Sequence, residues 1–210
     1  MRRRTVVFDV GGVIVRWQPE LLMRQCFAQQ AIDSASAERV KTLVFQSFAD
    51  GADWAAFDRG VVEPALLADR IAERSGLPRQ GVVALIDAIP EHLQPMADSV
   101  ALLERVRAAG HRLALLSNMP RPYAAHLEAT HACFGWFDHC AWSGRLGVMK
   151  PQRGIFDHLQ SALELDLADA IFLDDHHGNI DAARGYGWNA LHFESAALCE
   201  AALVRDGWLR

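Results

Sequence analysis

The sequence predicts an α/β protein, in which a Rossmann-like parallel sheet has helices on both faces and carries an inserted, all-helical cap. Three observations lead to this prediction. Apolar, strand-like runs alternate with helical segments, each run ends in polar residues, and a long strand-free stretch follows the first run. Continuous apolar strands separated by helices are typical of parallel sheets that are buried on both faces.

The expected strands are short runs of β-branched and other apolar residues. The first, Thr5–Val7, runs into the tight turn FDVGG, and Val13–Val15 follows the two glycines. The second strand is Arg112–Leu116 and the third is Ala170–Leu173. Because ligands collect at the carboxyl ends of strands in such sheets, we expect the polar residues that follow these three strands to converge.

Apolar residues at helical spacing predict three crossover helices, over Asp98–Ala109, Phe156–Leu165 and Asn179–Gly185. The stretch between Pro19 and Ile89 differs, because it contains amphipathic segments but no convincing strand. These segments are Glu20–Gln29, Ala37–Phe48, Trp54–Phe57, Pro64–Arg74 and Arg79–Ala88. We therefore expect a catalytic core formed by residues 1–16 and 90–210, and a helical cap formed by residues 17–89.

Composition and charge restrict the class of protein. A chain of 210 residues, 51% hydrophobic and with a net charge of −5, fits one globular core with a smaller insertion. It offers no basic face for nucleic acid. The four cysteines form no C-x-x-C pair, which favours reduced thiols, and no apolar run reaches the roughly 18 residues of a membrane span. We expect a cytoplasmic protein with no membrane or nucleic-acid partner; the sequence predicts no oligomeric state.

Polar groups capable of chemistry recur in a fixed order along the chain, at Asp9, Ser117–Asn118, Lys150–Pro151 and Asp174–Asp175. Each has an ordinary structural alternative. Asp9 could cap a glycine turn, Ser117–Asn118 could cap a helix, and Lys150 could be an exposed loop lysine. The ordered combination, placed at the ends of expected strands, favours a catalytic site over four unrelated structural roles.

The segments that carry this order resemble the haloacid dehalogenase-like hydrolase superfamily over essentially the full chain. The matching segments are VVFDVGGVIV at 6–15, LALLSN at 113–118, SGRLGVMKPQRGIF at 143–156 and IFLDDHHGNIDAAR at 171–184, with FDRG at 57–60 in the cap. The likeness is greatest to small capped enzymes that include sugar-1-phosphate phosphatases and the amino-terminal phosphatase domain of soluble epoxide hydrolases.

The resemblance implies a carboxylate nucleophile and a magnesium site. Asp9 would attack phosphorus and form an aspartyl-phosphate, which divides one difficult displacement into two easier ones. Mg²⁺ would be held by Asp9, the backbone carbonyl of Gly11 and Asp175. Asp174 would orient a metal-bound water, although the sequence does not decide which of the two adjacent acids is the direct ligand.

The resemblance also implies a binding site for the phosphoryl group. Ser117, Asn118 and Gly12 would bind it, and Lys150 would stabilise the charge that builds on its oxygens. Trp17 follows the first strand closely enough to lie near the mouth of the substrate cleft. Phe45, Phe48, Trp54 and Phe57 could also line a substrate pocket under the cap, but most aromatic residues in amphipathic helices are core. Asn179 is expected to support the acidic loop or to cap the following helix.

One position departs from the usual pattern of phosphatases in this superfamily. The second residue after the nucleophile is commonly an aspartate that protonates the leaving alcohol, but here it is Gly11, which has no titratable group. We therefore keep three hypotheses. The first is a Mg²⁺-dependent phosphatase acting on a small phosphorylated metabolite such as a sugar phosphate. The others are a 2-haloacid dehalogenase, against which the pair Asp174–Asp175 argues, and a catalytically weak binding protein.

Overall fold

The computed structural model describes residues 3–209 and contains a five-stranded, wholly parallel sheet. Its strands are β1 (Thr5–Phe8), β2 (Arg112–Ser117), β3 (His139–Trp142), β4 (Ala170–Asp174) and β5 (Asn189–His192), in the spatial order β3-β2-β1-β4-β5. The predicted fold class and its three strands are confirmed. The two edge strands were not predicted, because they are four residues long and only partly buried, so they lack a continuous apolar run.

The register of the sheet explains why the polar strand ends meet. Phe8 of β1 is aligned with Leu115 of β2 on one side and with Leu173 of β4 on the other. The residues that follow these three positions therefore emerge at the same edge. Val13–Val15 does not extend β1, because the N–H groups of Ile14 and Val15 donate to the carbonyl of Val10 and fold this segment into a turn.

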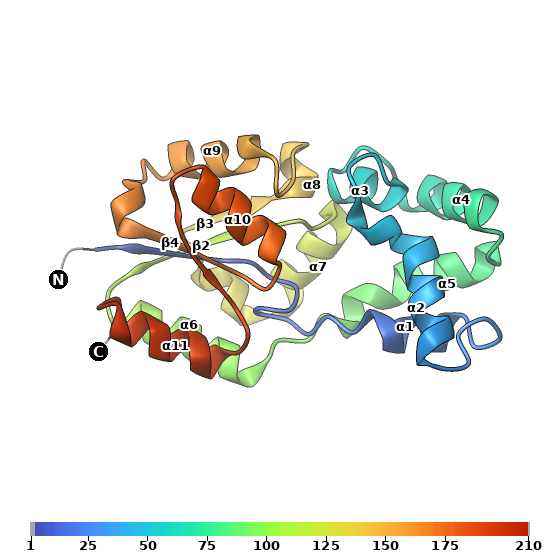
Figure 1. Ribbon diagram of the computed structural model, residues 1–210, viewed down its shortest axis with the longest axis horizontal. Helices are drawn as coiled ribbons and strands as arrows, with labels where there is room; N and C mark the ends of the chain where they lie inside the picture. Colours follow the sequence, from blue (N-terminus) through green and yellow to red (C-terminus); the bar gives the residue numbers. More distant parts are fainter. Residues whose placement is uncertain (1–2, 210) are drawn as a thin grey trace.

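Successive side chains of each strand point to opposite faces of the sheet, so the core has two layers. Val6 and Phe8 belong to one buried cluster and Val7 to the other. Helices α6 (Ala97–Ala108) and α11 (Ala196–Arg205) cover the first face. Helices α9 (Arg153–Ala162) and α10 (His177–Gly185) cover the second, so the sheet is enclosed as the sequence predicts (Figure 1).

The inserted segment is all-helical among the residues that the structure describes. Its elements are α1 (Pro19–Cys26), α2 (Ser34–Phe45), the 3₁₀ turn η1 (Gln46–Phe48), α3 (Asp53–Asp58), α4 (Pro64–Ser75) and α5 (Arg79–His92). They lie beside the carboxyl end of the sheet, at the opposite end of the molecule from the N-terminus (Figure 1). The predicted domain boundary at residue 89 stays a prediction, and α5 continues through it to His92.

Two linkers join the cap to the core, and they run side by side. The N–H of Arg16 donates to the carbonyl of Gln94 at 2.9 Å, and the N–H of Met96 donates to the carbonyl of Ile14 at 2.9 Å. From the core, α7 (Arg121–Thr130) packs against α5, and α8 (Ser143–Leu146) packs against α3. Two 3₁₀ turns, η2 (Ala132–Trp136) and η3 (Leu167–Asp169), complete the helical elements of the core within residues 3–209. This arrangement places a pocket between the two parts.

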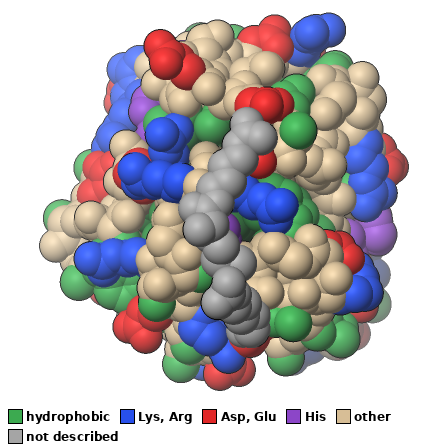
Figure 2. Space-filling model, turned by 90° about the vertical axis from the view of Figure 1, so that its left-hand side faces the viewer, with side chains coloured by type: hydrophobic (Ala, Val, Ile, Leu, Met, Phe, Trp, Pro, Cys, Tyr) green, Lys and Arg blue, Asp and Glu red, His purple; other side chains and the backbone are tan. Residues whose placement is uncertain are grey.

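The opposite end of the core, which carries the N-terminus, shows basic and acidic side chains interspersed with apolar ones (Figure 2). Within residues 3–209, no helix is both long and apolar enough to cross a bilayer.

Candidate active site

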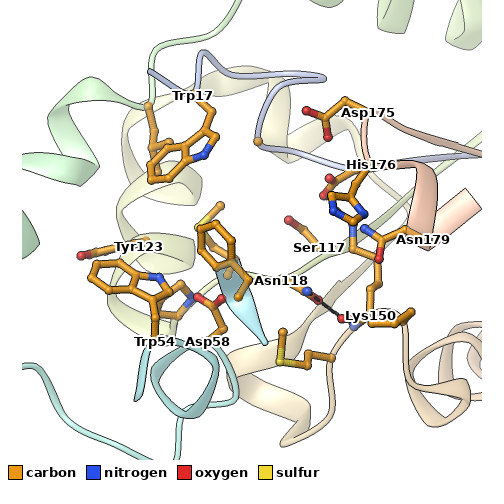
Figure 3. A pocket seen from close by; sticks show the side chains of 18 of the residues that line it. Trp17, Trp54, Asp58, Ser117, Asn118, Tyr123, Lys150, Asp175, His176 and Asn179 are labelled. Atoms are coloured by element: carbon orange, nitrogen blue, oxygen red, sulfur yellow. Dashed lines mark hydrogen bonds and ion pairs between the residues drawn. The ribbon is translucent and has the colours of Figure 1, made fainter. Parts of the chain in front are cut away.

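A pocket of about 270 Å³ lies between the carboxyl end of the sheet and the cap. The core contributes its polar base, and the cap contributes much of its apolar wall. Figure 3 shows Asp175, His176 and Asn179 on one side of the pocket, with Trp54 and Asp58 on the other. The predicted residues Asp9, Gly11, Trp17, Ser117, Asn118, Lys150 and Asp175 all line it.

A buried lysine joins two aspartates at the base of the pocket. The Nζ atom of Lys150 lies 2.7 Å from Oδ1 of Asp9 and 2.6 Å from Oδ2 of Asp174. Lys150 is 2% exposed and Asp174 is fully buried. An ammonium group so placed compensates two carboxylates that would otherwise be costly to remove from water. Lys150 is thus part of the site and not the exposed loop lysine of the structural alternative.

Asn118 positions Lys150 through both ends of its side-chain amide. Its Nδ2 donates to the backbone carbonyl of Lys150 at 2.9 Å, and its Oδ1 accepts from the backbone N–H of Lys150 at 2.7 Å. The amide side chain is therefore engaged with protein. Ser117, at the end of β2, is 1% exposed and lines the pocket.

The two adjacent acids at the end of β4 have different surroundings. The carboxylate of Asp174 accepts from Lys150, from the backbone N–H of His176 at 2.8 Å, and from Nδ2 of Asn179 at 3.1 and 3.0 Å. Asn179 thus supports the acidic loop, as expected. Asp175 is exposed and lines the pocket. Asp175 is therefore the freer of the two to bind a cation directly, with Asp174 as the carboxylate that orients its neighbours.

The three carboxylates fit a small divalent cation. Asp9, Asp174 and Asp175 each offer one oxygen, and these oxygens all lie within 4.8 Å of one another. Lys150 offsets only part of their combined negative charge. Hard cations such as Mg²⁺ are bound by carboxylate and carbonyl oxygens, so the donor set suits magnesium better than a metal that prefers nitrogen or sulfur.

The electrostatics of the site reflect this excess of acid. Burial raises the pKa of Asp9 to about 7; Lys150 lowers it, and the charges of Asp174 and Asp175 raise it. Loss of solvent and the charge of Asp174 also raise the pKa of Asp175. For Lys150, the two adjacent aspartates outweigh the effect of burial and raise its pKa. A cation near the acids would favour the ionised form of Asp9.

The two glycines after Asp9 have different roles. Gly11 lines the pocket, and a Cβ atom added to it would meet no heavy atom within 4 Å. Gly12 has a φ of +76°, and an added Cβ would clash with Oδ2 of Asp175. Its N–H donates to the carbonyl of Val15 at 2.9 Å. Gly12 therefore makes room for the acidic loop, and its backbone N–H is not available to the phosphoryl group that it was expected to bind.

Two of the cap aromatics, Phe48 and Trp54, line the pocket together with Trp17, although the core was the favoured expectation for both. Tyr123 and Asp58 also line the pocket, and sequence reasoning missed both. Asp58 belongs to the FDRG segment, but its chemistry was not recognised, because a single acid in a short amphipathic helix gives no signal without the tertiary contact.

Comparisons with known proteins agree with this architecture. The model for haloacid dehalogenase-like hydrolases matches residues 3–187. The sesquiterpene phosphatase astK of Aspergillus oryzae is 26% identical over 198 residues, which cover 93% of both chains. The (S)-2-haloacid dehalogenase H-109 of Pseudomonas putida is 26% identical over 98 residues, or 46% of this chain and 43% of the dehalogenase.

Among solved structures, a HAD family enzyme of Bacteroides thetaiotaomicron, in complex with magnesium and inorganic phosphate, superposes with a TM-score of 0.67. It is 19% identical in sequence, and the match covers 90% of this chain and 93% of the other. At this level of identity, the match shows a shared fold. Because the family model covers most of the chain, which has the expected parallel sheet, the protein belongs to the haloacid dehalogenase-like hydrolases.

Proposed function

We propose that this hydrolase is a Mg²⁺-dependent phosphatase that cleaves a small phosphate monoester through an aspartyl-phosphate on Asp9. The observation that carries the proposal is the grouping of Asp9, Lys150 and the pair Asp174–Asp175 at the base of one pocket. A carboxylate there can act as nucleophile, and the adjacent cations can reduce its repulsion from a phosphate dianion.

Different residues would bind the phosphoryl group and attack its phosphorus. Asp9 would form the bond to phosphorus, while Lys150 holds its carboxylate at 2.7 Å and offsets charge on the phosphoryl oxygens. Ser117 would donate its hydroxyl proton to one of those oxygens. Asp9, the carbonyl of Gly11 and Asp175 would hold Mg²⁺, which when bound would neutralise the phosphate charge and align the ester.

The wall of the pocket favours an ester whose organic part is largely apolar. Trp17, Phe48, Trp54 and Met149 surround the space above the polar base. The hydroxyl of Tyr123 donates to the carbonyl of Ile86 at 2.8 Å, so it is engaged within the protein. Apolar walls with a few convergent polar groups bind apolar ligands and fix their orientation.

This wall makes a phosphate ester of a small apolar alcohol a better candidate than a sugar phosphate, whose hydroxyls need hydrogen-bonding partners. The name of the Aspergillus oryzae relative, a sesquiterpene phosphatase, points in the same direction.

The second candidate is a 2-haloacid dehalogenase, in which the same Asp9 would attack carbon. The partial match to the Pseudomonas putida dehalogenase supports it. The exposed carboxylate of Asp175 argues against it, because a metal-independent reaction gains nothing from a further negative charge beside the nucleophile. A third candidate is a weakly active binding protein that retains the fold.

The test is phosphate release from 4-nitrophenyl phosphate and from n-hexyl phosphate, with Mg²⁺ and with EDTA. We expect release from both esters with Mg²⁺, and loss of turnover in EDTA and in Asp9→Asn. The control is Asp69→Asn, because Asp69 is an exposed cap residue paired with Arg79. Halide release from 2-chloropropionate in EDTA would instead support the dehalogenase, and inertness toward a wide panel of phosphate esters would support the binding protein.

A further inference from the structure

A buried acid from the cap faces the catalytic pocket. Asp58 ends helix α3, is 4% exposed, and lines the same pocket as Asp9. Figure 3 shows it beside Trp54, on the cap side of the pocket. The two aspartates therefore reach one space from different parts of the molecule, Asp9 from the core and Asp58 from the cap.

The backbone of Asp58 is hydrogen-bonded to the core, whereas its carboxyl forms no ion pair among the residues that the structure describes. The hydroxyl of Ser143 donates to the backbone carbonyl of Asp58 at 2.6 Å and accepts from the N–H of Met119 at 2.8 Å. This contact ties α3 of the cap to the core. The adjacent Arg59 pairs with Asp50 at 2.9 Å. Within residues 3–209, no lysine, arginine or histidine forms an ion pair with the carboxyl of Asp58.

A buried carboxyl without a counter-charge is held in its neutral form. Burial raises the pKa of Asp58 to about 8; the charge of Arg59 and the indole N–H of Trp54 lower it. From the core, Tyr123 of α7 also faces Asp58, and burial and the charge of Asp58 raise the pKa of that phenol. At neutral pH Asp58 therefore carries a proton that it can donate.

The reaction needs such a donor, because Gly11 stands where a proton-donating aspartate is usual. An alkoxide is a poor leaving group unless its oxygen is protonated as the bond to phosphorus breaks. We propose that Asp58, from the cap, protonates the leaving oxygen of the ester and thus replaces the acid that Gly11 lacks. This role rests on the proposed phosphatase function.

The protons and bonds balance over two steps. In the first, a carboxylate oxygen of Asp9 bonds to phosphorus, and the bond from phosphorus to the ester oxygen breaks. The ester oxygen keeps that electron pair and takes the proton of Asp58, so a neutral alcohol leaves. In the second, Asp58 as carboxylate takes a proton from the water that attacks phosphorus, and the bond to Asp9 breaks. Hydrogen phosphate leaves, and both aspartates regain their starting charge.

The test compares esters that differ in their need for a proton. The leaving group of 4-nitrophenyl phosphate is stable as an anion, whereas that of n-hexyl phosphate is not. In Asp58→Asn we expect kcat/KM for n-hexyl phosphate to fall by about 10²–10⁴-fold, the usual contribution of general acid catalysis. We expect kcat/KM for 4-nitrophenyl phosphate to fall by less than about tenfold. Asn has nearly the same shape as Asp, and thermal melting checks that the variant is folded.

The outcomes separate this role from the proposed function. Asp69→Asn serves as the matched control in the cap and should leave both values unchanged. If Asp58→Asn lowers kcat/KM by the same factor for both esters, or for neither, Asp58 is not the proton donor, and the phosphatase function stands on the wild-type activity. If the wild-type protein releases no phosphate from either ester, the proposed function and the role of Asp58 both fail.

Discussion

Replacing Lys150 by methionine tests the electrostatic design of the site most directly. The chain has only two lysines, and this one is buried between Asp9 and Asp174 at 2.7 and 2.6 Å. Methionine retains much of the volume of the side chain but removes its charge. The variant therefore leaves two buried carboxylates without their ammonium partner, while the packing around them changes little.

The size of the effect follows from the surroundings of the two acids. Removing one partner of a buried ion pair costs about 3–5 kcal/mol. Asp174 keeps its hydrogen bonds from His176 and Asn179, and Asp9, whose pKa is already about 7, can take up a proton. We therefore expect the lower end, about 3 kcal/mol, which for a chain of this size lowers Tm by roughly 6–12 °C.

The assay is urea unfolding in EDTA, with Lys41→Met as the control. Lys41 pairs with Glu38 on the surface, so its loss should cost less than about 1 kcal/mol. Without Lys150 the folded-state pKa of Asp9 rises further above its unfolded value, so the loss of stability should grow as pH rises from 5.5 to 8. We also expect kcat to fall by about 10²–10³-fold.

Two results would refute this reasoning. A Lys150→Met protein as stable as the wild type at pH 8 would show that the lysine does not compensate the buried acids. A loss of stability that is equal at pH 5.5 and pH 8 would show that the carboxylates are not the groups responsible.

Three further predictions concern residues around the site. Gly11→Asp should restore part of the kcat/KM for n-hexyl phosphate that Asp58→Asn loses, because an added Cβ at Gly11 meets nothing within 4 Å. No recovery in the double variant would argue that a missing acid is not the cause of the loss. In EDTA, the free energy of unfolding should fall as pH rises from 6 to 8.5, because the folded-state pKa of Asp58 is about 8, above its unfolded value. Urea unfolding of Asp58→Asn should show a pH dependence that is smaller by up to about 1.4 kcal/mol per pH unit, and equal pH dependence in the two proteins would contradict this. Trp17→Ala should raise KM for n-hexyl phosphate about tenfold through lost apolar contact, leaving inhibition by inorganic phosphate unchanged; equal changes in both would place Trp17 at the phosphate site.

The sequence predicted those elements whose burial follows from a local pattern of apolar residues. The runs ending at Phe8, Ser117 and Asp174 are apolar enough to be recognised as buried strands, and the amphipathic cap segments have helical spacing. The edge strands β3 and β5 were missed because partial burial leaves them no apolar pattern. Gly12, the second glycine after Asp9, was expected to bind phosphate. In the structure, its lack of a side chain allows the close approach of Asp175, which only the folded loop creates.

The sequence by itself determined the fold class, the order of the polar strand ends and the family resemblance, because β-strand burial and turn chemistry are encoded by neighbouring residues. Only the tertiary structure decided which of those groups contact one another and which are buried. It bound Asn118 to the backbone of Lys150, enclosed Asp174 while leaving Asp175 open, and brought Asp58 of the cap to the pocket that Asp9 lines. These relations join residues far apart in the chain, and their energies depend on burial and distance, which no local pattern specifies.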